Sequence, residues 1–222
     1  MTTVGLVGSG SIGLAIARLA VDAGHRVVLS NSRGPATLRD TAASLGPQAS
    51  AATSAEAAAA GDIVVITVPV SAFPHLPAAP LAGKAVIDVC NYGPERDGPV
   101  PELDSRSLTS SELLQRYVPD AFLVKAFNNI FVKHLLSLAR PSGAPDRSFV
   151  PIAGDSAPAR ATVTAFIDSL GYGVVDAGRL ADGWRQSTGT PVWATSYGPF
   201  SHERGRPADE ATIRTALALA TR

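Results

Sequence analysis

Apolar residues over positions 1–125 alternate between short continuous runs and stripes with helical spacing. The continuous runs cover residues 4–7, 27–29, 63–68, 85–89 and 122–127. Runs that are apolar at nearly every position are typical of parallel strands buried on both faces. One stripe has the i, i+3, i+4, i+7 spacing of a helix face, and its members are Ile12, Ala15, Ile16, Leu19 and Ala20. The alternation predicts an α/β fold with helices on both faces of a parallel sheet.

The second part of the chain continues this alternation less regularly. Thr109 and Glu112 have the spacing of a capping box, which predicts a helix from there to Tyr117. Further segments predict a strand over 149–152, a helix that ends at Gly171, a strand over 174–175 and a helix over 213–220. We therefore expect one domain over residues 1–140. A small C-terminal α/β extension over 141–222 would pack on it and serve substrate binding or dimerisation.

A glycine motif directly follows the first apolar run, with the sequence Gly8, Ser9, Gly10, Ser11, Ile12, Gly13. It lies between a strand and an amphipathic helix, the context that distinguishes a dinucleotide-binding loop from a chance match. In such a loop Gly8 permits the tight turn, Gly10 lets the backbone approach a pyrophosphate, and Gly13 lets the helix pack closely. The helix N-terminus offers free N–H groups to the phosphates. The motif predicts a doubly wound (Rossmann) domain, the alternative being a glycine turn without a ligand.

The end of the second predicted strand bears on which dinucleotide is bound. NAD-specific sites usually place a carboxylate there to bind the ribose 2′-hydroxyl. This chain instead has Asn31, Ser32 and Arg33, and the first acid beyond them is Asp40. Arginine can bind a 2′-phosphate with two hydrogen bonds, and Ser and Asn can donate to its oxygens. The segment favours NADP(H), unless Arg33 merely lies in solvent at the start of a helix.

Composition mainly excludes classes of function. The chain has 19 Lys plus Arg and 19 Asp plus Glu, and no basic run, which argues against nucleic acid as a partner. A single cysteine, Cys90, excludes a disulfide framework, and no spacing of metal ligands is present, so no metal is expected. There is no signal-peptide pattern and no apolar run long enough for a membrane span. We expect a cytoplasmic protein that acts on a small molecule.

The carboxyl ends of the later strands are where the nicotinamide should lie, because ligands of open α/β sheets bind outside these ends. Val68 and Pro69 follow one predicted strand, Asn91 another and Asn128 a third. Pro69 either forms a wall of the cofactor site or is an ordinary turn proline. Asn91 and Asn128 either bond the ribose or carboxamide or cap their own loops.

No general acid stands out in the sequence. His134 and Tyr92 are weak candidates, although a packing or surface role is the commoner one for such a histidine. Lys125 lies within a predicted strand, where its side chain is either paired or directed at a cleft. The aromatic residues of the aperiodic C-terminal segment either line a substrate wall or form a core or dimer contact; they are Trp184, Trp193, Tyr197 and Phe200.

Together these residues resemble the NADP-dependent coenzyme F420 oxidoreductase family. The resemblance lies in the glycine loop, the Ser32-Arg33 segment, residues 150–155 and residues 171–178, which end in Asp-Ala-Gly. It implies that Ser9, Ser11, Ser32 and Arg33 hold cofactor phosphates and that the nicotinamide lies near Pro69, Asn91 and Asn128. It also implies a homodimer and hydride transfer between NADP(H) and the deazaflavin F420.

Three functional hypotheses follow from these features. The first is an NADPH-dependent oxidoreductase that moves a hydride to a small acceptor, F420 by resemblance. Segment 183–206 is polar, aromatic and Pro/Gly-rich instead of apolar and helical as in F420-using members, so an imine or carbonyl reductase is an alternative. The third hypothesis is a non-catalytic NADP(H)-binding sensor.

Overall fold

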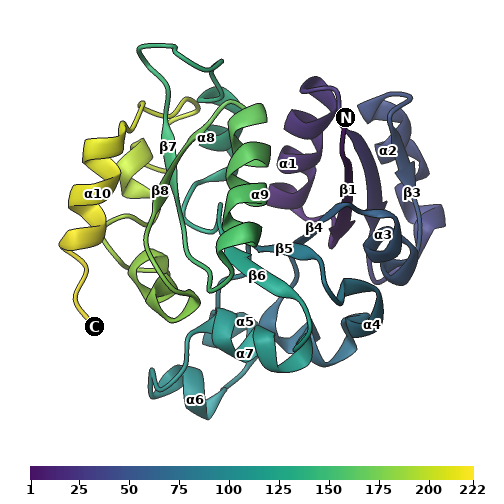
Figure 1. Cartoon of the computed structure of the whole chain (residues 1–222), viewed down its shortest axis with the longest axis horizontal. Coiled ribbons are helices and arrows are strands. Elements are labelled where there is room, and N and C mark those ends of the chain that lie inside the picture. Colours follow the sequence, from purple (N-terminus) through teal and green to yellow (C-terminus); the bar gives the residue numbers. More distant parts are fainter.

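A parallel six-stranded sheet forms the centre of the computed structural model, which describes residues 1–222 (Figure 1). Its strands are β1 (Thr3–Val7), β2 (Arg26–Ser30), β3 (Ala49–Ala51), β4 (Ile63–Ile66), β5 (Ala85–Asp88) and β6 (Phe122–Lys125). They are arranged in the order β3-β2-β1-β4-β5-β6. The order reverses between β1 and β4, which makes the crevice between these strands the topological switch point. The predicted doubly wound α/β fold is confirmed.

Helices cover both faces of the sheet. The α-helices are α1 (Ser11–Asp22), α2 (Arg39–Leu45), α3 (Ser54–Ala60), α4 (Ala78–Leu81), α5 (Pro94–Asp97), α6 (Pro101–Asp104), α7 (Ser110–Tyr117), α8 (Val132–Ser137), α9 (Ala157–Ser169) and α10 (Glu210–Ala218). Four 3₁₀ segments complete the chain: η1 (Pro35–Leu38), η2 (Val70–His75), η3 (Leu180–Gln186) and η4 (Thr195–Tyr197). None of these helices combines the length and apolar character that a membrane crossing requires.

Strand β4 shows why the apolar runs have no polar alternation. Ile63 and Val65 pack into the apolar cluster that includes α1, α2 and α9. Val64 and Ile66 pack into a second cluster with α3, α4 and α7. Successive side chains of a strand point to opposite faces, so both faces of this strand require apolar residues.

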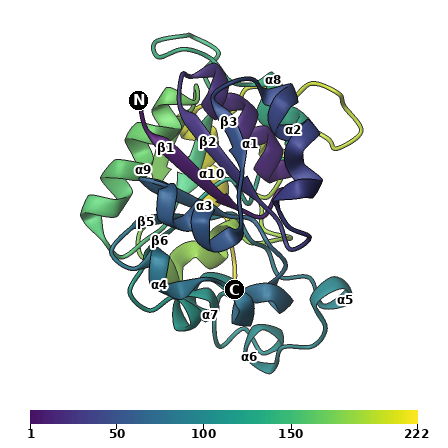
Figure 2. The same cartoon turned by 90° about the vertical axis from the view of Figure 1, so that its right-hand side faces the viewer.

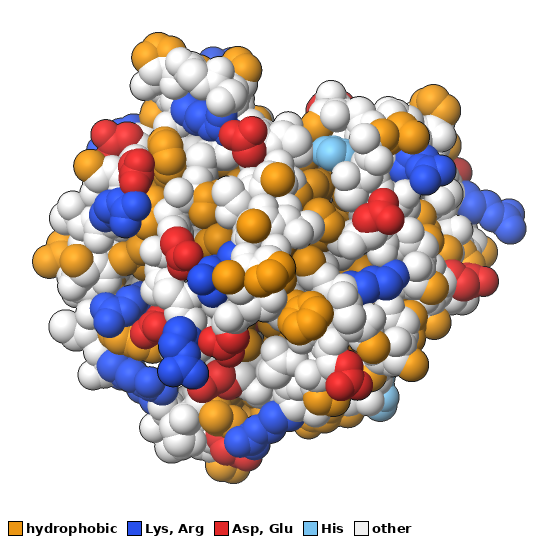
Figure 3. Space-filling model, viewed as in Figure 1, with side chains coloured by type: hydrophobic (Ala, Val, Ile, Leu, Met, Phe, Trp, Pro, Cys, Tyr) orange, Lys and Arg blue, Asp and Glu red, His pale blue; other side chains and the backbone are white.

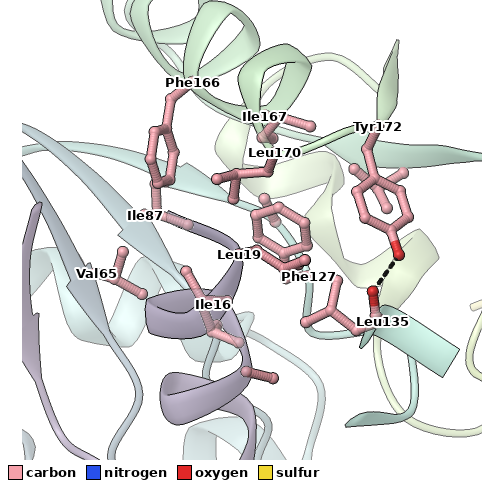
Figure 4. Close-up of a cluster of buried hydrophobic side chains, with 14 of the residues drawn as sticks. Ile16, Leu19, Val65, Ile87, Phe127, Leu135, Phe166, Ile167, Leu170 and Tyr172 are labelled. Carbon is pink, nitrogen blue, oxygen red and sulfur yellow. Dashed lines mark hydrogen bonds between the residues drawn. The ribbon is translucent and has the colours of Figure 1, made fainter. Parts of the chain in front are cut away.

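The C-terminal extension forms a second, two-stranded parallel sheet of β7 (Phe149–Ile152) and β8 (Gly173–Asp176). The backbones of Lys125 and Ala153 join it to β6 through an antiparallel bridge, with N···O distances of 2.8 and 3.1 Å. Helix α9 connects the two strands and packs on β5 and β6. Phe166 of α9 and its C-cap residue Leu170 lie in one cluster with Leu19 of α1, so the main core continues across residue 140 (Figure 4).

Some local predictions differ from the structure. The capping box of Thr109 and Glu112 is present as predicted. The edge strand β3 was not expected, because Ala-Ser-Ala lacks the β-branched and aromatic residues that favour strands. The predicted strands over 63–68 and 122–127 end early, at Ile66 and Lys125, because the chain turns there into the loops of the carboxyl edge.

A buried ion pair joins the carboxyl ends of β5 and β6. Lys125 Nζ lies 3.1 Å from Asp88 Oδ2 and donates to the carbonyl oxygen of Cys90 at 2.6 Å. Ser111 Oγ, from the first turn of α7, donates to the same carboxylate oxygen at 2.6 Å, and the Cys90 N–H donates to Asp88 Oδ1 at 2.8 Å. The side chains of Lys125 and Asp88 are 1% and 0% exposed. Lys125 is therefore paired.

Substituting Lys125 by Met should remove the cation and leave the Asp88 carboxylate buried without its partner. We expect the free energy of unfolding to fall by about 3–5 kcal/mol, the usual cost of breaking a buried pair from one side. Urea denaturation followed by circular dichroism measures it. The control is Lys133→Met, which removes a largely exposed partner of Glu203 and should cost at most about 1 kcal/mol. Equal losses in the two variants would contradict the role given to the buried pair.

Candidate cofactor and acceptor site

The three glycines of the loop after β1 meet different surroundings. Gly8 has a φ of +104°, and a Cβ there would lie 2.3 Å from the carbonyl oxygen of Thr67. A Cβ on Gly13 would lie 2.7 Å from Thr67 Cγ2, so this glycine lets α1 approach the chain that follows β4. A Cβ on Gly10 would meet no atom within 4 Å. Gly8 and Gly13 are therefore required by the fold, whereas Gly10 borders open space where a ligand can approach the backbone.

The N-terminus of α1 is free to bind an anion. Gly10 is its N-cap, and no side chain caps the helix there. The loop itself is fixed, because Ser9 Oγ and the Gly8 N–H both donate to the carbonyl oxygen of Ser30, at 2.8 and 3.2 Å. The first N–H groups of an uncapped helix are unsatisfied donors at the positive end of the helix dipole. The geometry fits the pyrophosphate of a dinucleotide.

The segment after β2 holds an arginine without a partner in the structure. Asn31 Oδ1 accepts from the Arg33 N–H at 3.0 Å, and Asn31 Nδ2 donates to Thr37 Oγ1 at 2.9 Å. The Asn31 amide therefore shapes the turn, and its predicted bond to a phosphate stays a prediction. Ser32 and Arg33 are exposed, and their side chains make no hydrogen bond or ion pair. The Arg33 guanidinium remains available to a 2′-phosphate.

A pocket of about 350 Å³ lies beside the N-terminus of α1. We call it the acceptor pocket, and its lining residues are Ser11, Ile12, Val89, Asn91, Phe127, Asn128, Asn129, Ile130, Phe131, Val132, Trp193, Ala194 and Phe200. Four residues predicted for the cofactor site thus come together in its lining: Ser11 and Ile12 of the glycine motif, Asn91 after β5 and Asn128 after β6. Val68 and Pro69 do not line this pocket, although Val68 lies against the glycine loop at Gly8.

Asn91 and Asn128 hold each other at the pocket wall. Asn128 Nδ2 donates to Asn91 Oδ1 at 3.0 Å, and Asn91 Nδ2 donates to the carbonyl oxygen of Asn128 at 2.7 Å. Asn128 Nδ2 also donates to the Gln186 carbonyl at 2.7 Å. The Oδ1 atom of Asn128 is buried and has no partner in the chain. An unsatisfied buried oxygen is a suitable acceptor for an N–H group of a ligand, such as a carboxamide.

The aromatic residues of the C-terminal segment divide between two roles. Trp193 and Phe200 line the acceptor pocket, where Phe200 packs edge-to-face against Trp193 at 5.3 Å and against Phe131 at 5.2 Å. Tyr197 is a core residue, and its hydroxyl donates to the carbonyl oxygen of Phe149 at 2.9 Å. Trp184 lies outside this pocket. Phe131 was missed in the sequence, where its position close behind Asn128 was the only available signal.

Neither candidate general acid lines the acceptor pocket. His134 is fully buried, with Nε2 3.1 Å from the carbonyl oxygen of His202 and its ring packed on Phe131. The Tyr92 hydroxyl donates to Asp104 Oδ1 at 2.6 Å, and this hydrogen bond, with burial, raises the pKa of Tyr92. No side chain that lines the pocket is ionisable. The pocket can therefore hold and orient a molecule but has no side chain to protonate it.

Charged side chains of both signs are interspersed over the face of the molecule shown in Figure 3. On this face the charged residues form no broad basic surface. The loop, the unpartnered arginine and the pocket lie along one edge of a doubly wound sheet. Together they define a dinucleotide-binding protein.

Comparisons with known proteins identify the family. The model of the family described as NADP oxidoreductase, coenzyme F420-dependent, matches residues 3–92. A hypothetical protein from Sinorhizobium meliloti, SMa0349, is 31% identical, with a TM-score of 0.75 over 87% of this chain and 94% of that chain. A protein from Arthrobacter sp. FB24, provisionally named an F420-dependent NADP reductase, is 26% identical, with a TM-score of 0.66 over 81% and 86% of the chains.

This chain belongs to the F420-dependent NADP oxidoreductase family. An imine reductase from Pseudomonas sp. shares the fold, with 18% identity and a TM-score of 0.54 over 81% of this chain and 57% of that chain. No protein in a search of curated sequences matches. The family and its structural relatives support NADP(H) as the dinucleotide and oxidoreductase activity in general.

Substituting Gly10 by Ala should separate ligand binding from folding. The added methyl group projects into open space, so we expect a loss of stability of at most about 1 kcal/mol and a Kd for NADPH raised about tenfold or more. Thermal unfolding and a fluorescence titration with NADPH measure the two quantities. The matched variant Gly8→Ala adds the same methyl group against the Thr67 carbonyl and should mainly lower the melting temperature. Unchanged NADPH binding by Gly10→Ala would contradict the placement of the pyrophosphate.

Proposed function

We propose that this protein transfers a hydride between NADP(H) and a planar acceptor held in the acceptor pocket, and that the acceptor is the deazaflavin F420. The family match supports NADP(H) and names F420. The observation that carries the proposal is the character of the pocket. Its lining has aromatic, aliphatic and amide side chains and no ionisable group. Such a lining favours a flat ring system that accepts the hydride from NADPH and takes the accompanying proton from solvent after the transfer, since no side chain of the pocket can supply it.

Each part of the site has a separate task in this proposal. Bound NADPH would supply the hydride from its nicotinamide ring. The free N–H groups at the start of α1 hold the pyrophosphate, and Arg33 with Ser32 holds the 2′-phosphate. The Oδ1 atom of Asn128 accepts from the carboxamide, which fixes the orientation of the ring. Trp193, Phe200 and Phe131 enclose the acceptor and exclude water.

A carbonyl or imine acceptor is supported less well. Reduction of either group normally requires a proton donor near the reacting atom. His134 and Tyr92 would have to supply it, but the first is bonded to a backbone carbonyl and the second to Asp104 outside the acceptor pocket. The similarity between this chain and the imine reductase concerns the fold only. A non-catalytic sensor would bind NADPH without turnover on any acceptor.

Acceptor identity can be tested by following NADPH oxidation at 340 nm with F420, and separately with a panel of cyclic imines and ketones. We expect NADPH oxidation with F420 as the acceptor and none with the imines or ketones. The variant Trp193→Ala should raise the KM for F420 several-fold and leave the KM for NADPH unchanged, because this side chain lines only the acceptor pocket. Turnover on imines or ketones without F420 turnover would overturn the assignment. Tight NADPH binding with no turnover would favour the sensor.

Cofactor preference can be tested at Arg33. The variant Arg33→Ala should raise the Kd for NADPH at least tenfold and leave the Kd for NADH within about twofold, because only NADPH carries the 2′-phosphate. Isothermal titration with both cofactors measures this ratio. Arg214→Ala is the control, since Arg214 pairs with Glu210 on α10, away from the site. Equal weakening of both cofactors in Arg33→Ala would refute the role of Arg33.

A further inference from the structure

A second pocket of about 500 Å³ lies next to the acceptor pocket, and Asn91 lines both. Four parts of the chain form it: residues 91–92 after β5, residues 103–110 around the start of α7, residues 184–191 of the extension, and residues 219–222. The C-terminus lies near α6 and α7 in Figure 2, and Arg222 donates to the carbonyl oxygen of Arg106. We call this cavity the arginine pocket.

The charged side chains that line the arginine pocket are all basic. Arg106 and Arg222 line it, and none of the acidic residues does. The acids of α6 and α7 all have partners in the chain: Glu102 pairs with Arg116 at 3.7 Å, Asp104 accepts from the hydroxyl of Tyr92, which lines the pocket, and Glu112 caps the N-terminus of α7. The guanidinium group of Arg106 makes no hydrogen bond or ion pair with the chain. In a chain with equal numbers of acids and bases, such a cavity is a local site for an anion.

Further hydrogen-bond donors surround this charge. The hydroxyl groups of Ser110, Thr188 and Thr221 line the pocket and have no partner in the chain. A guanidinium group with several hydroxyl donors matches the oxygens of a phosphate or carboxylate. Trp184 adds a flat face, over which the guanidinium carbons of Arg185 and Arg222 lie 4.8 and 6.0 Å from the ring centroid.

We propose that the arginine pocket binds an oxyanion, a phosphate or a carboxylate, carried by the molecule whose reactive ring lies in the acceptor pocket. The shared wall at Asn91 makes the two ligand groups neighbours. The pocket lies beyond β5, whereas Arg33 and the glycine loop follow β2 and β1, so the phosphates of the dinucleotide are held at a different part of the edge. The inference rests on the proposed function in that it assigns the oxyanion to the hydride acceptor.

Binding of inorganic pyrophosphate to NADP⁺-saturated protein tests the pocket itself, because the cofactor then occupies its own phosphate positions. We expect saturable binding by isothermal titration that Arg106→Gln weakens at least fivefold. Thr188→Glu, which adds a negative charge to the lining, should weaken it similarly. Arg204→Gln is the matched control, since Arg204 is exposed, unpartnered and outside the pocket. No binding to the saturated wild-type protein, or equal binding by all variants, overturns the proposal.

Steady-state kinetics test the link to the acceptor. F420 is compared with the deazaflavin nucleoside that lacks its phosphate-bearing side chain. Arg106→Gln should raise the KM for F420 at least fivefold, with kcat and the KM for the truncated acceptor unchanged. An equal effect on both acceptors would overturn the assignment of the oxyanion to the acceptor. If neither compound is reduced, the proposed function fails, and the pyrophosphate titration alone decides whether the arginine pocket binds an anion.

Discussion

The ion pair of Lys125 and Asp88 is the interaction on which the carboxyl edge of the sheet depends. It closes the ends of β5 and β6, and it holds the first turn of α7 through Ser111 and the loop after β5 through Cys90. Asn91 and Asn128, which form the wall of the acceptor pocket, follow these two strands within three residues. Desolvating two charges is costly, and the gain in stability over an apolar pair is small. What the pair supplies is a fixed spacing of the two loops.

The same strand ends also attach the C-terminal extension. Ala153 pairs with the Lys125 backbone, and Gln186 donates to the Lys125 carbonyl oxygen at 3.3 Å. The segment that continues from Gln186 brings Trp193 and Phe200 to the acceptor pocket. Lys125 thus contacts both the loops that carry Asn91 and Asn128 and the segment that leads to Trp193 and Phe200. A displacement of β6 would therefore move both walls of the acceptor pocket together. The extension is held in place by these contacts with β6 and by the core that it shares with the sheet.

The cofactor side of this arrangement could be predicted from the sequence, because its signals are local. The glycine loop lies between a strand and a helix, and the absence of an acid after β2 is visible in four consecutive residues. The acceptor side could not be predicted to the same extent. Trp193 and Phe200 come from a segment without periodicity and meet Phe131 only through tertiary packing. The burial of His134 beneath His202 likewise depends on that packing.

Charge is distributed along the edge in a way that the zero net charge conceals. Several of the basic side chains are neutralised by nearby acids, as in the pairs Arg140–Asp146 and Arg214–Glu210. The unpartnered guanidinium groups of Arg33 and Arg106 follow β2 and β5, which are separated in the sheet by β1 and β4. The acceptor pocket has no ionisable side chain in its lining. Separate cationic positions of this kind attract small anionic ligands and offer no continuous field to a polyanion. Under the proposed function, the 2′-phosphate of NADP(H) would bind at Arg33 and an oxyanion of the acceptor would bind at Arg106, at opposite ends of the site.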